Sequence, residues 1–416
     1  MRLAIAPALV LVGLLAPPAQ ARIKLAALPA RQRVEIQLDH GRYTLVEEER
    51  IVPLLQSTPA RGNNRIDFSW SNTQIDKDSI QFRPLAIRVG GEFKPIGKVS
   101  GEGGNDEVSV INVAYPPNEN ALVWEVFSAE PCAVKVRVSY LISNLTRSFA
   151  YRALADKDET TLTLKKYIQL RNYSGEDFGS AGVWAGFGPA FLKPVGMSED
   201  IKMLLRRFDG VKIRKSFTFD WFAHGPLNND KPLASRVLMH YELVNDEDHG
   251  LGAFPLQGGK VRIFIDDGRG GEAFLGEDWA RLTPLEDKMR LYLGEARDVA
   301  CTRIVKSDKR HPIKGNLFDR ELVIRYEIEN FKDTPCTLDI VEQINRIAGE
   351  GQYGRHPHGD AEWELGEQTS DEIEIAYDDG HATPKLSVEL PARPADKDAD
   401  VKKVIVTFHF TIKNLW

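Results

Sequence analysis

Two histidines and an aspartate lie close enough in the sequence to bind one metal ion. His356, His358 and Asp360 fall within five consecutive residues, and imidazole nitrogens and carboxylate oxygens are ligands of zinc and other transition ions. Metal sites, however, usually draw their ligands from more than one rigid element. Pro357 and Gly359 favour an exposed loop here. We therefore interpret the segment as a solvated polar loop and keep its three polar residues as the metal candidate.

Three cysteines, Cys132, Cys301 and Cys336, allow at most one disulfide bond within the chain. Cys301 and Cys336 flank a strand-like segment, and neighbouring strands could bring them together as a candidate disulfide. The alternative is that all three are separate buried thiols. A nucleophilic cysteine would need a nearby histidine or an electropositive helix start, and the local sequence shows neither.

Two acidic segments, residues 245–248 and 266–267, carry carboxylate and amide oxygens, which calcium prefers as ligands. Neither has the alternating oxygen spacing and the distal glutamate of a calcium-binding loop. Asp and Asn are also frequent in turns, because their side chains bond the local backbone. The sequence therefore favours turns over calcium sites at both positions.

Motifs of the common catalytic families are absent from the sequence. It contains no HExxH zinc site, GxxxxGK(S/T) phosphate loop, GxGxxG dinucleotide turn, GxSxG nucleophile elbow or SxxK motif. Catalytic residues can assemble from distant positions, so these absences exclude families rather than chemistries. A carboxylate pair for glycoside cleavage is recognised by geometry, which the sequence does not show. We predict no specific catalytic residue and no cofactor, and we lean toward a protein that is not an enzyme.

Exposed aromatic rings would favour sugar binding, and the candidates are Trp70, Trp184, Trp221, Trp279 and Trp363. The alternative is that most of these rings pack in the core or at strand edges, where large aromatic residues are favoured. We expect the alternative to hold for most of them.

Apolar and polar residues alternate in short runs along almost the whole chain, which is the pattern of half-buried β-strands. A turn-rich segment at residues 266–271 predicts a β-hairpin between the runs on either side of it. The predicted strands cover residues 34–38, 43–46, 65–68, 79–82, 132–145, 160–170, 212–222, 260–265, 272–275, 288–293, 299–305, 321–328, 336–344, 372–375, 386–390 and 401–412.

One helix is predicted, at residues 198–210. Ile201, Leu204, Leu205 and Phe208 would share one helical face, with a serine as N-cap and a glycine as the stop. The residues that follow return to the alternation of a strand.

The predicted fold class is all-β, with two or three β-sandwich domains and little helix. Seven short strands between residues 288 and 412 match an immunoglobulin-like sandwich, which we predict for the C-terminal domain. The predicted domains are residues 22–135, an N-terminal β-domain, residues 136–290, a central β-rich domain, and residues 291–416, the immunoglobulin-like domain.

Residues 1–21 have the features of a cleaved signal peptide. Met1 and Arg2 precede an apolar run that is too short to span a bilayer, and residues 19–21 form a small-x-small cleavage site. No cysteine lies near that site, so no lipid anchor is expected. The sequence thus predicts a periplasmic or secreted protein that spans no membrane after cleavage. A buried N-terminal helix is the alternative, which a Pro-Pro pair would end.

A series of short segments occurs in order along the chain, at residues 46–50, 75–80, 138–142 with Tyr151, 172–177, 254–264, 274–278 and 291–299. This series resembles an uncharacterised group of bacterial exported proteins related to the mucoidy inhibitor A proteins. The segments have the family's order, and only the series as a whole is specific. Residues 147–149 depart from the family, which commonly has a tryptophan there, and the long helical insertion of many members is missing.

This resemblance implies a β-rich exported protein with no assigned activity and no catalytic residues to transfer. We expect a non-enzymatic envelope protein, a binding or interaction module in cell-envelope or surface-polysaccharide homeostasis, whose partner is an envelope protein or a polysaccharide. The alternative is an exported glycan-active enzyme or carbohydrate-binding protein. The net charge of −6 argues against a nucleic-acid partner.

Overall fold

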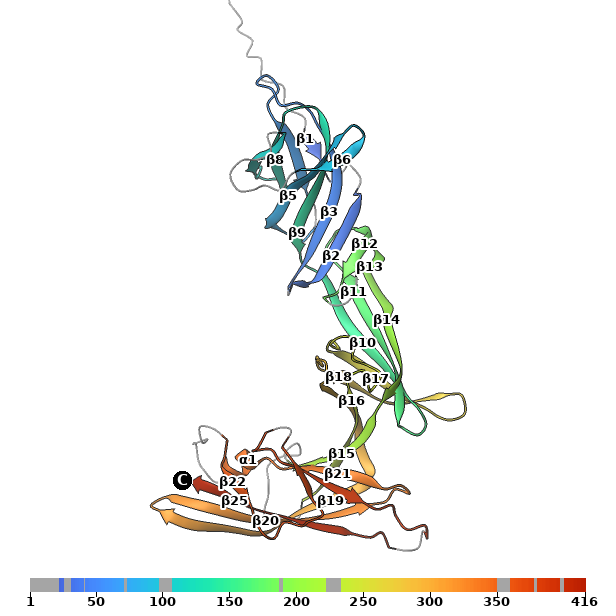
Figure 1. Ribbon diagram of the computed structural model, residues 1–416, viewed down its shortest axis with the longest axis vertical. Helices are drawn as coiled ribbons and strands as arrows, with labels where there is room; N and C mark the ends of the chain where they lie inside the picture. Colours follow the sequence, from blue (N-terminus) through green and yellow to red (C-terminus); the bar gives the residue numbers. More distant parts are fainter. Residues whose placement is uncertain are drawn as a thin grey trace, which may run out of the picture. The chain divides into compact units, whose positions relative to one another are not determined.

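The computed structural model describes residues 22–25, 31–40, 42–70, 73–96, 107–186, 190–221, 233–349, 360–377, 380–396 and 400–416. It confirms the all-β prediction, because strands make up almost all of the regular structure (Figure 1). The predicted signal peptide lies outside the described residues, as do His356 and His358. No helix of the described chain has both the length and the apolar character needed to cross a membrane.

Contacts within the chain divide it into two compact units. The first unit contains residues 1–148 and 169–202, and the second contains residues 149–168 and 203–416. The units differ from the three consecutive domains expected from the sequence, because three strands contribute residues to both units. These strands are β10 (Leu145–Ala155), β11 (Thr161–Asn172) and β14 (Glu199–Lys212).

The first unit contains a four-stranded sheet of order β1-β4-β8-β7 and a seven-stranded sheet of order β13-β12-β2-β3-β9-β5-β6. The rings of Phe68 and Tyr140 lie 5.5 Å apart between centroids, and those of Phe82 and Trp124 lie 4.9 Å apart. Each pair joins one strand of each sheet, so the two sheets pack together through aromatic side chains. The strands are β1 (Arg22–Lys24), β2 (Arg33–His40), β3 (Tyr43–Leu54), β4 (Asn64–Ser69), β5 (Ile75–Val89), β6 (Glu92–Pro95), β7 (Val108–Ala114), β8 (Ala121–Ser128), β9 (Cys132–Ile142), β12 (Gly179–Trp184) and β13 (Phe191–Val195).

A five-stranded sheet has the order β14-β11-β10-β17-β18, with β17 at Gly259–Asp266 and β18 at Glu272–Ala280. Strands β17 and β18 pair in antiparallel fashion from Gly259 and Ala280 to Asp266 and Glu272. This pairing confirms the hairpin that the turn-rich segment predicted.

A nine-stranded sheet of order β22-β25-β20-β19-β16-β15-β21-β24-β23 forms most of the second unit (Figure 1). Strands predicted separately at 288–293 and 299–305 are parts of the single strand β19, whose pairing with its neighbours contains irregularities. The elements are β15 (Arg214–Asp220), β16 (Leu233–Val244), β19 (Lys288–Lys314), β20 (Leu317–Asn330), β21 (Cys336–Val341), α1 (Ile344–Gly349), β22 (Trp363–Leu365), β23 (Glu374–Ala376), β24 (Lys385–Leu390) and β25 (Val404–Leu415).

The core of this sheet follows directly from the alternation in the sequence. Val406, Phe408, Phe410 and Ile412 of β25 are all buried, and the residues between them are more exposed, as the sequence predicted. They join a cluster that includes buried residues of β15, β19, β20, β21, α1 and β24. Apolar burial of this extent is the main force that stabilises such a sheet.

The immunoglobulin-like prediction is not confirmed. The C-terminal strands belong to one hydrogen-bonded series of nine strands that also includes β15 and β16, which precede residue 291. The predicted sandwich would instead divide its strands between two sheets.

The helix predicted at residues 198–210 is wrong, because this segment is strand β14. Ile201, Met203 and Leu205 alternate with more exposed neighbours, and β14 pairs with β11. The same residues thus satisfy a period of two, and pairing with a neighbouring strand outweighs the weak helical pattern. Helix α1, which lies within the described residues, is short and follows β21, where the sequence predicted a longer strand.

We expect Phe408→Ala to destabilise the protein by about 3–5 kcal/mol, because it leaves a cavity in the core. Phe408 is fully buried, and its ring centroid lies 4.8 Å from that of Phe410. Urea unfolding measures the change in the free energy of unfolding.

The matched control for this variant is Ile405→Ala on the same strand, because the Ile405 side chain is 52% exposed. It should change the free energy of unfolding by no more than about 0.5 kcal/mol. Equal losses in the two variants would contradict the assignment of β25's buried face.

Candidate functional site

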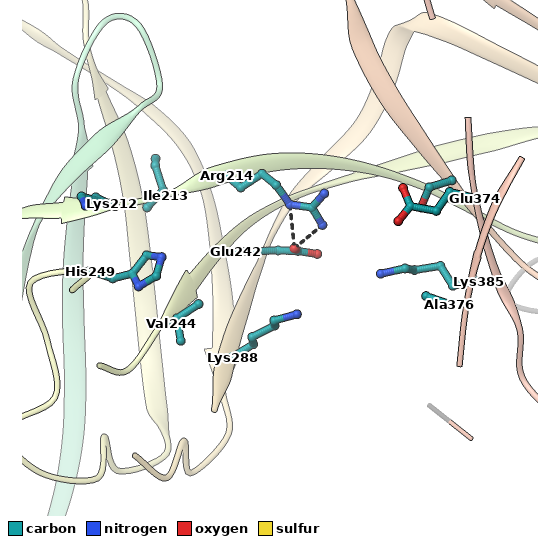
Figure 2. A pocket seen from close by; sticks show the side chains of 11 residues that line it. Lys212, Ile213, Arg214, Glu242, Val244, His249, Lys288, Glu374, Ala376 and Lys385 are labelled. Carbon is teal, nitrogen blue, oxygen red and sulfur yellow. Dashed lines mark hydrogen bonds and ion pairs between the residues drawn. The ribbon is translucent and has the colours of Figure 1, made fainter. Parts of the chain in front are cut away.

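A cleft lined by cations lies in the second unit, beside the polar side of β15 and β16 (Figure 2). Its volume is about 480 Å³. We call it the cationic cleft and define it by its charged and titratable residues. These are Lys212, Arg214, Lys288 and Lys385, with Glu242, Glu374 and His249.

Strand pairing places the central groups of the cleft next to one another. Arg214 of β15 is opposite Glu242 of β16, and Glu242 is opposite Arg290 of β19. Side chains alternate across a sheet, so Tyr241 and Leu243 occupy the opposite side of β16, where both are buried. The pairing of these three strands thus places a carboxylate between two guanidinium groups.

Glu242 is held by both arginines. The Nη2 atom of Arg214 lies 2.7 Å from Oε2 of Glu242, and Nε of Arg290 lies 3.2 Å from Oε1. Burial alone would raise the pKa of the Glu242 carboxyl, but the hydrogen bond and charge of Arg214 and the charge of Arg290 lower it. The carboxylate is therefore ionised at neutral pH and does not serve as a proton donor there.

The remaining charges make the cleft positive. Four Lys and Arg side chains line it against two carboxylates, and Glu242 is already engaged by Arg214 and Arg290. Lys212 and Lys288 are exposed. Figure 2 shows the ammonium groups of Lys288 and Lys385 directed toward the open space beside Glu242. This arrangement suits an anionic ligand such as a carboxylate or a phosphate.

A second hollow adjoins the cationic cleft and shares Lys288 with it. Its volume is about 590 Å³, and three rings line it, those of His240, Trp279 and Tyr292. We call it the aromatic hollow. The ring centroids of His240 and Tyr292 lie 5.6 Å apart. Burial lowers the pKa of His240 to about 4, and the charge of Arg290 adds to this effect, so the imidazole is neutral at pH 7.

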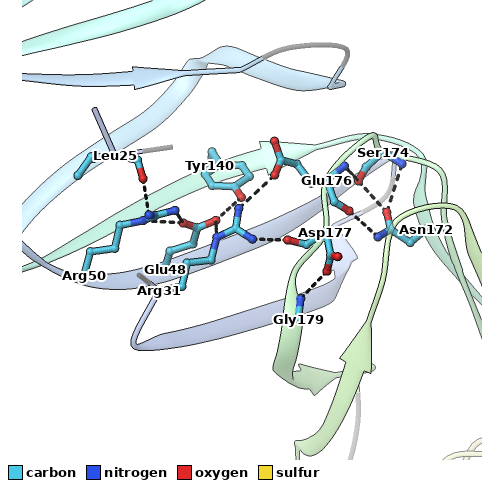
Figure 3. Close-up of polar contacts among 10 residues, drawn as sticks. All are labelled: Leu25, Arg31, Glu48, Arg50, Tyr140, Asn172, Ser174, Glu176, Asp177 and Gly179. Carbon is cyan, nitrogen blue, oxygen red and sulfur yellow. Dashed lines mark hydrogen bonds and ion pairs between the residues drawn. The ribbon is translucent and has the colours of Figure 1, made fainter. Parts of the chain in front are cut away.

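A closed ionic network lies in the first unit, around the fully buried Glu48 (Figure 3). Its carboxylate accepts hydrogen bonds from Nη2 of Arg50 at 2.7 Å and from the hydroxyl of Tyr140 at 2.7 Å. The Nε atom of Arg31 lies 3.0 Å from the same carboxylate and its Nη2 atom 3.1 Å from Glu176. The network has no opening to solvent at Glu48, so we interpret it as structural.

Glu342 is the centre of a similar buried network in the second unit. It accepts hydrogen bonds from Nε of Arg303 at 2.7 Å, from the indole of Trp221 at 2.7 Å and from the hydroxyl of Tyr326. Burial raises the pKa of the nearby Cys301 thiol well above its usual range, and the charge of Glu342 adds to this. A thiol in that environment is not a nucleophile at neutral pH.

The cysteines are free thiols in the structure, so the candidate bridge between Cys301 and Cys336 is not formed. These residues lie on β19 and β21, and the sheet order places β16 and β15 between those two strands. Side chains separated by two intervening strands do not reach disulfide geometry.

The metal candidate is only partly described. Asp360 accepts a hydrogen bond from Nδ2 of Asn345 at 2.9 Å, whereas His356 and His358 lie outside the described residues. Over the described ranges, no three His, Cys, Asp or Glu residues are grouped so that they could hold a metal ion.

The acidic segments form turns. Asp246 accepts hydrogen bonds from the backbone and ring nitrogens of His249, and Asp267 accepts them from the backbone of Arg269 and Gly271. Their carboxylates satisfy local backbone donors, which is the turn chemistry that the sequence favoured over calcium.

The five tryptophans lie in different environments. Trp221 and Trp363 are buried, and Trp70 and Trp184 are half-buried. Trp279 is 68% exposed. Most of the candidates are therefore core or half-buried residues, as expected, and one remains available at the surface.

Sequence reasoning missed Arg214, Glu242 and Lys288, although each lies at a polar position of an alternating run. Alternation could place them on the solvent side of their strands. It could not show that β15, β16 and β19 are neighbours, which depends on pairing between distant segments.

No protein-family model and no curated protein matches the chain. The family resemblance described above therefore stays a prediction.

We expect Glu48→Gln to destabilise the protein by about 3–5 kcal/mol, because it removes the fully buried carboxylate that the guanidinium groups of Arg31 and Arg50 both contact. Urea unfolding measures the loss. Glu92→Gln, at an exposed position of the same unit, is the control and should be close to neutral. A Glu48 variant as stable as the control would show that the network does not stabilise the fold.

The low pKa of His240 predicts a pH dependence of stability. Between about pH 6.5 and pH 4, the unfolded chain binds a proton at this imidazole that the folded chain does not, so the free energy of unfolding falls as the pH falls. Arg290, Glu242 and Asp278 are the charged groups that act on it.

His240→Gln should therefore have a shallower fall of stability than the wild type in this pH window. Urea titrations at pH 7, 5.5 and 4.5 provide the comparison. Parallel curves for the two proteins would refute the low pKa.

Proposed function

We propose that this chain is a non-enzymatic exported protein of the cell envelope, which binds an acidic polysaccharide through the cationic cleft. The observation that carries the proposal is the excess of cations in the cleft, where four Lys and Arg side chains meet two carboxylates. A polymer that repeats carboxylate or phosphate groups would bind such a surface by charge complementarity.

The state of Glu242 supports binding over catalysis. Glycoside hydrolysis needs one carboxylic acid whose pKa is raised, so that it protonates the leaving group, and a second carboxylate that stays ionised. In the cleft, burial acts to raise the pKa of Glu242, but the combined effects of Arg214 and Arg290 lower it. Glu242 could therefore serve only as the ionised carboxylate of such a pair, and the exported glycan-active enzyme that we kept as the alternative would need a separate proton donor in the cleft.

The location in the envelope rests on the sequence. Residues 1–21 read as a signal peptide, and the ordered segments resemble exported proteins related to the mucoidy inhibitor A proteins. Periplasmic and extracellular positions both expose the mature chain to acidic polysaccharides. An envelope protein remains the competing partner, and the binding experiment distinguishes it.

The test is binding of the mature chain to a panel of polygalacturonate, alginate and hyaluronate, with dextran as the neutral polymer. Isothermal titration calorimetry should detect binding to at least one acidic polymer and none to dextran. Affinity should fall with added salt, because salt screens exposed charges.

The double variant Lys212→Glu/Lys288→Glu should weaken this binding by about tenfold or more, equivalent to at least about 1.4 kcal/mol. Lys306→Glu is the matched control, since Lys306 is exposed on β19 and lines neither hollow. Failure of every acidic polymer to bind would overturn the proposal. A crosslinked envelope protein recovered in that case would favour the protein-interaction alternative.

A further inference from the structure

Trp279 is an exposed indole whose position is fixed by its surroundings. It lies on β18, at the end of the five-stranded sheet, and its side chain is 68% exposed. Its backbone nitrogen donates to Asp278 Oδ1 at 2.7 Å, and it is paired across the hairpin with Lys260, whose ammonium lies 5.6 Å from the ring centroid. An indole held in this way offers a ligand both an apolar face and a polar N–H group.

The same ring belongs to a hollow that also has polar groups. Tyr292 is 36% exposed, and its backbone nitrogen donates to Oδ2 of Asp278 at 2.7 Å, which links β18 to β19. Arg281 and Asp287 line the hollow as well and provide a donor and an acceptor. Ligand sites typically combine aromatic walls with a few polar groups in this way.

A pyranose ring has matching chemistry. One face of the sugar carries C–H groups and is apolar, whereas its rim carries hydroxyl groups that donate and accept hydrogen bonds. An exposed indole fits the face, and the carboxylates and guanidinium groups around it fit the rim.

The aromatic hollow and the cationic cleft adjoin each other at Lys288 of β19. Lys288 lines both, and Arg290, which lines the hollow, contacts Glu242 of the cleft through Nε at 3.2 Å. A polymer with acidic groups in the cleft would therefore have neighbouring sugar rings near Trp279.

We propose that the aromatic hollow is a sugar-binding subsite, in which Trp279 stacks on a pyranose ring of the acidic polysaccharide held by the cationic cleft. This inference rests on the proposed function and adds the part of the ligand that carries no charge. The subsite predicts that the protein recognises the sugar rings of the polymer as well as its negatively charged groups.

The test compares Trp279→Ala and Trp279→Phe, titrated with the acidic polymer of the panel that binds the wild type most tightly. Trp279→Ala should weaken binding about tenfold. Trp279→Phe keeps an aromatic face and should retain most of the affinity. Polyglutamate, which is acidic but has no sugar ring, should bind the wild type and Trp279→Ala equally.

The control variant is Phe274→Ala, at an aromatic position of the same strand that is 59% exposed and lines neither hollow. It should bind like the wild type. Circular dichroism and urea unfolding should show that all three variants fold, because both side chains are exposed.

One outcome is that Trp279→Ala binds with wild-type affinity while the charge-reversal variants still lose binding. That result would overturn the sugar subsite and leave the proposed function standing. Absence of binding to every acidic polymer by the wild type would overturn both. Equal losses in Trp279→Ala and Phe274→Ala would also overturn the subsite, because the effect would not be specific to the hollow.

Discussion

The carboxylate of Glu242 lies between the guanidinium groups of Arg214 and Arg290, and both hollows of the candidate site lie around this ion cluster. The cluster joins β15 and β16, which are consecutive in the chain, to β19, a later segment that pairs with β16. It also sets the charge of the site, since the arginines lower the pKa of Glu242 against the effect of its burial. Lys212 and Lys288 are exposed beside this cluster, and their positive charges can attract an anionic ligand.

The buried networks around Glu48 and Glu342 contain the same types of side chain as the cationic cleft, but in a structural role. Glu48 and Glu342 are fully buried, and each is neutralised by arginine and hydrogen-bonded by a tyrosine. Buried ion pairs add little net stability over apolar packing, but loss of one partner is costly. The difference from the cationic cleft is access, because the side chain of Arg214 is 54% exposed whereas that of Arg303 is 2% exposed. Access to solvent is therefore what separates a candidate binding site from a structural network here.

Local pattern predicted many of the strands, but it missed several, including β16 with Glu242, and it did not show how the strands are arranged. The alternation in β25 predicted its buried face correctly, whereas residues 198–210 satisfied both a helical and a strand period, and pairing with β11 decided for the strand. The sequence also favoured the turn at residues 266–271 and the burial of most tryptophans. It did not indicate the cationic cleft, because the cleft depends on which strands are neighbours. The immunoglobulin-like sandwich predicted for residues 291–416 is likewise not confirmed, because it too depends on which strands are neighbours.

Lysine footprinting tests the central claim most directly, because it reports on the individual ammonium groups of the cationic cleft. The mature protein is acetylated with a lysine-specific reagent in the presence of dextran or of the acidic polymer of the panel that binds most tightly, and mass spectrometry quantifies each site. We expect the acidic polymer to protect Lys212 and Lys288 while Lys306 reacts equally in both samples, and we expect dextran to protect none of the three. Equal labelling of Lys212 and Lys288 with and without every acidic polymer of the panel would contradict the binding of an acidic polysaccharide in the cationic cleft.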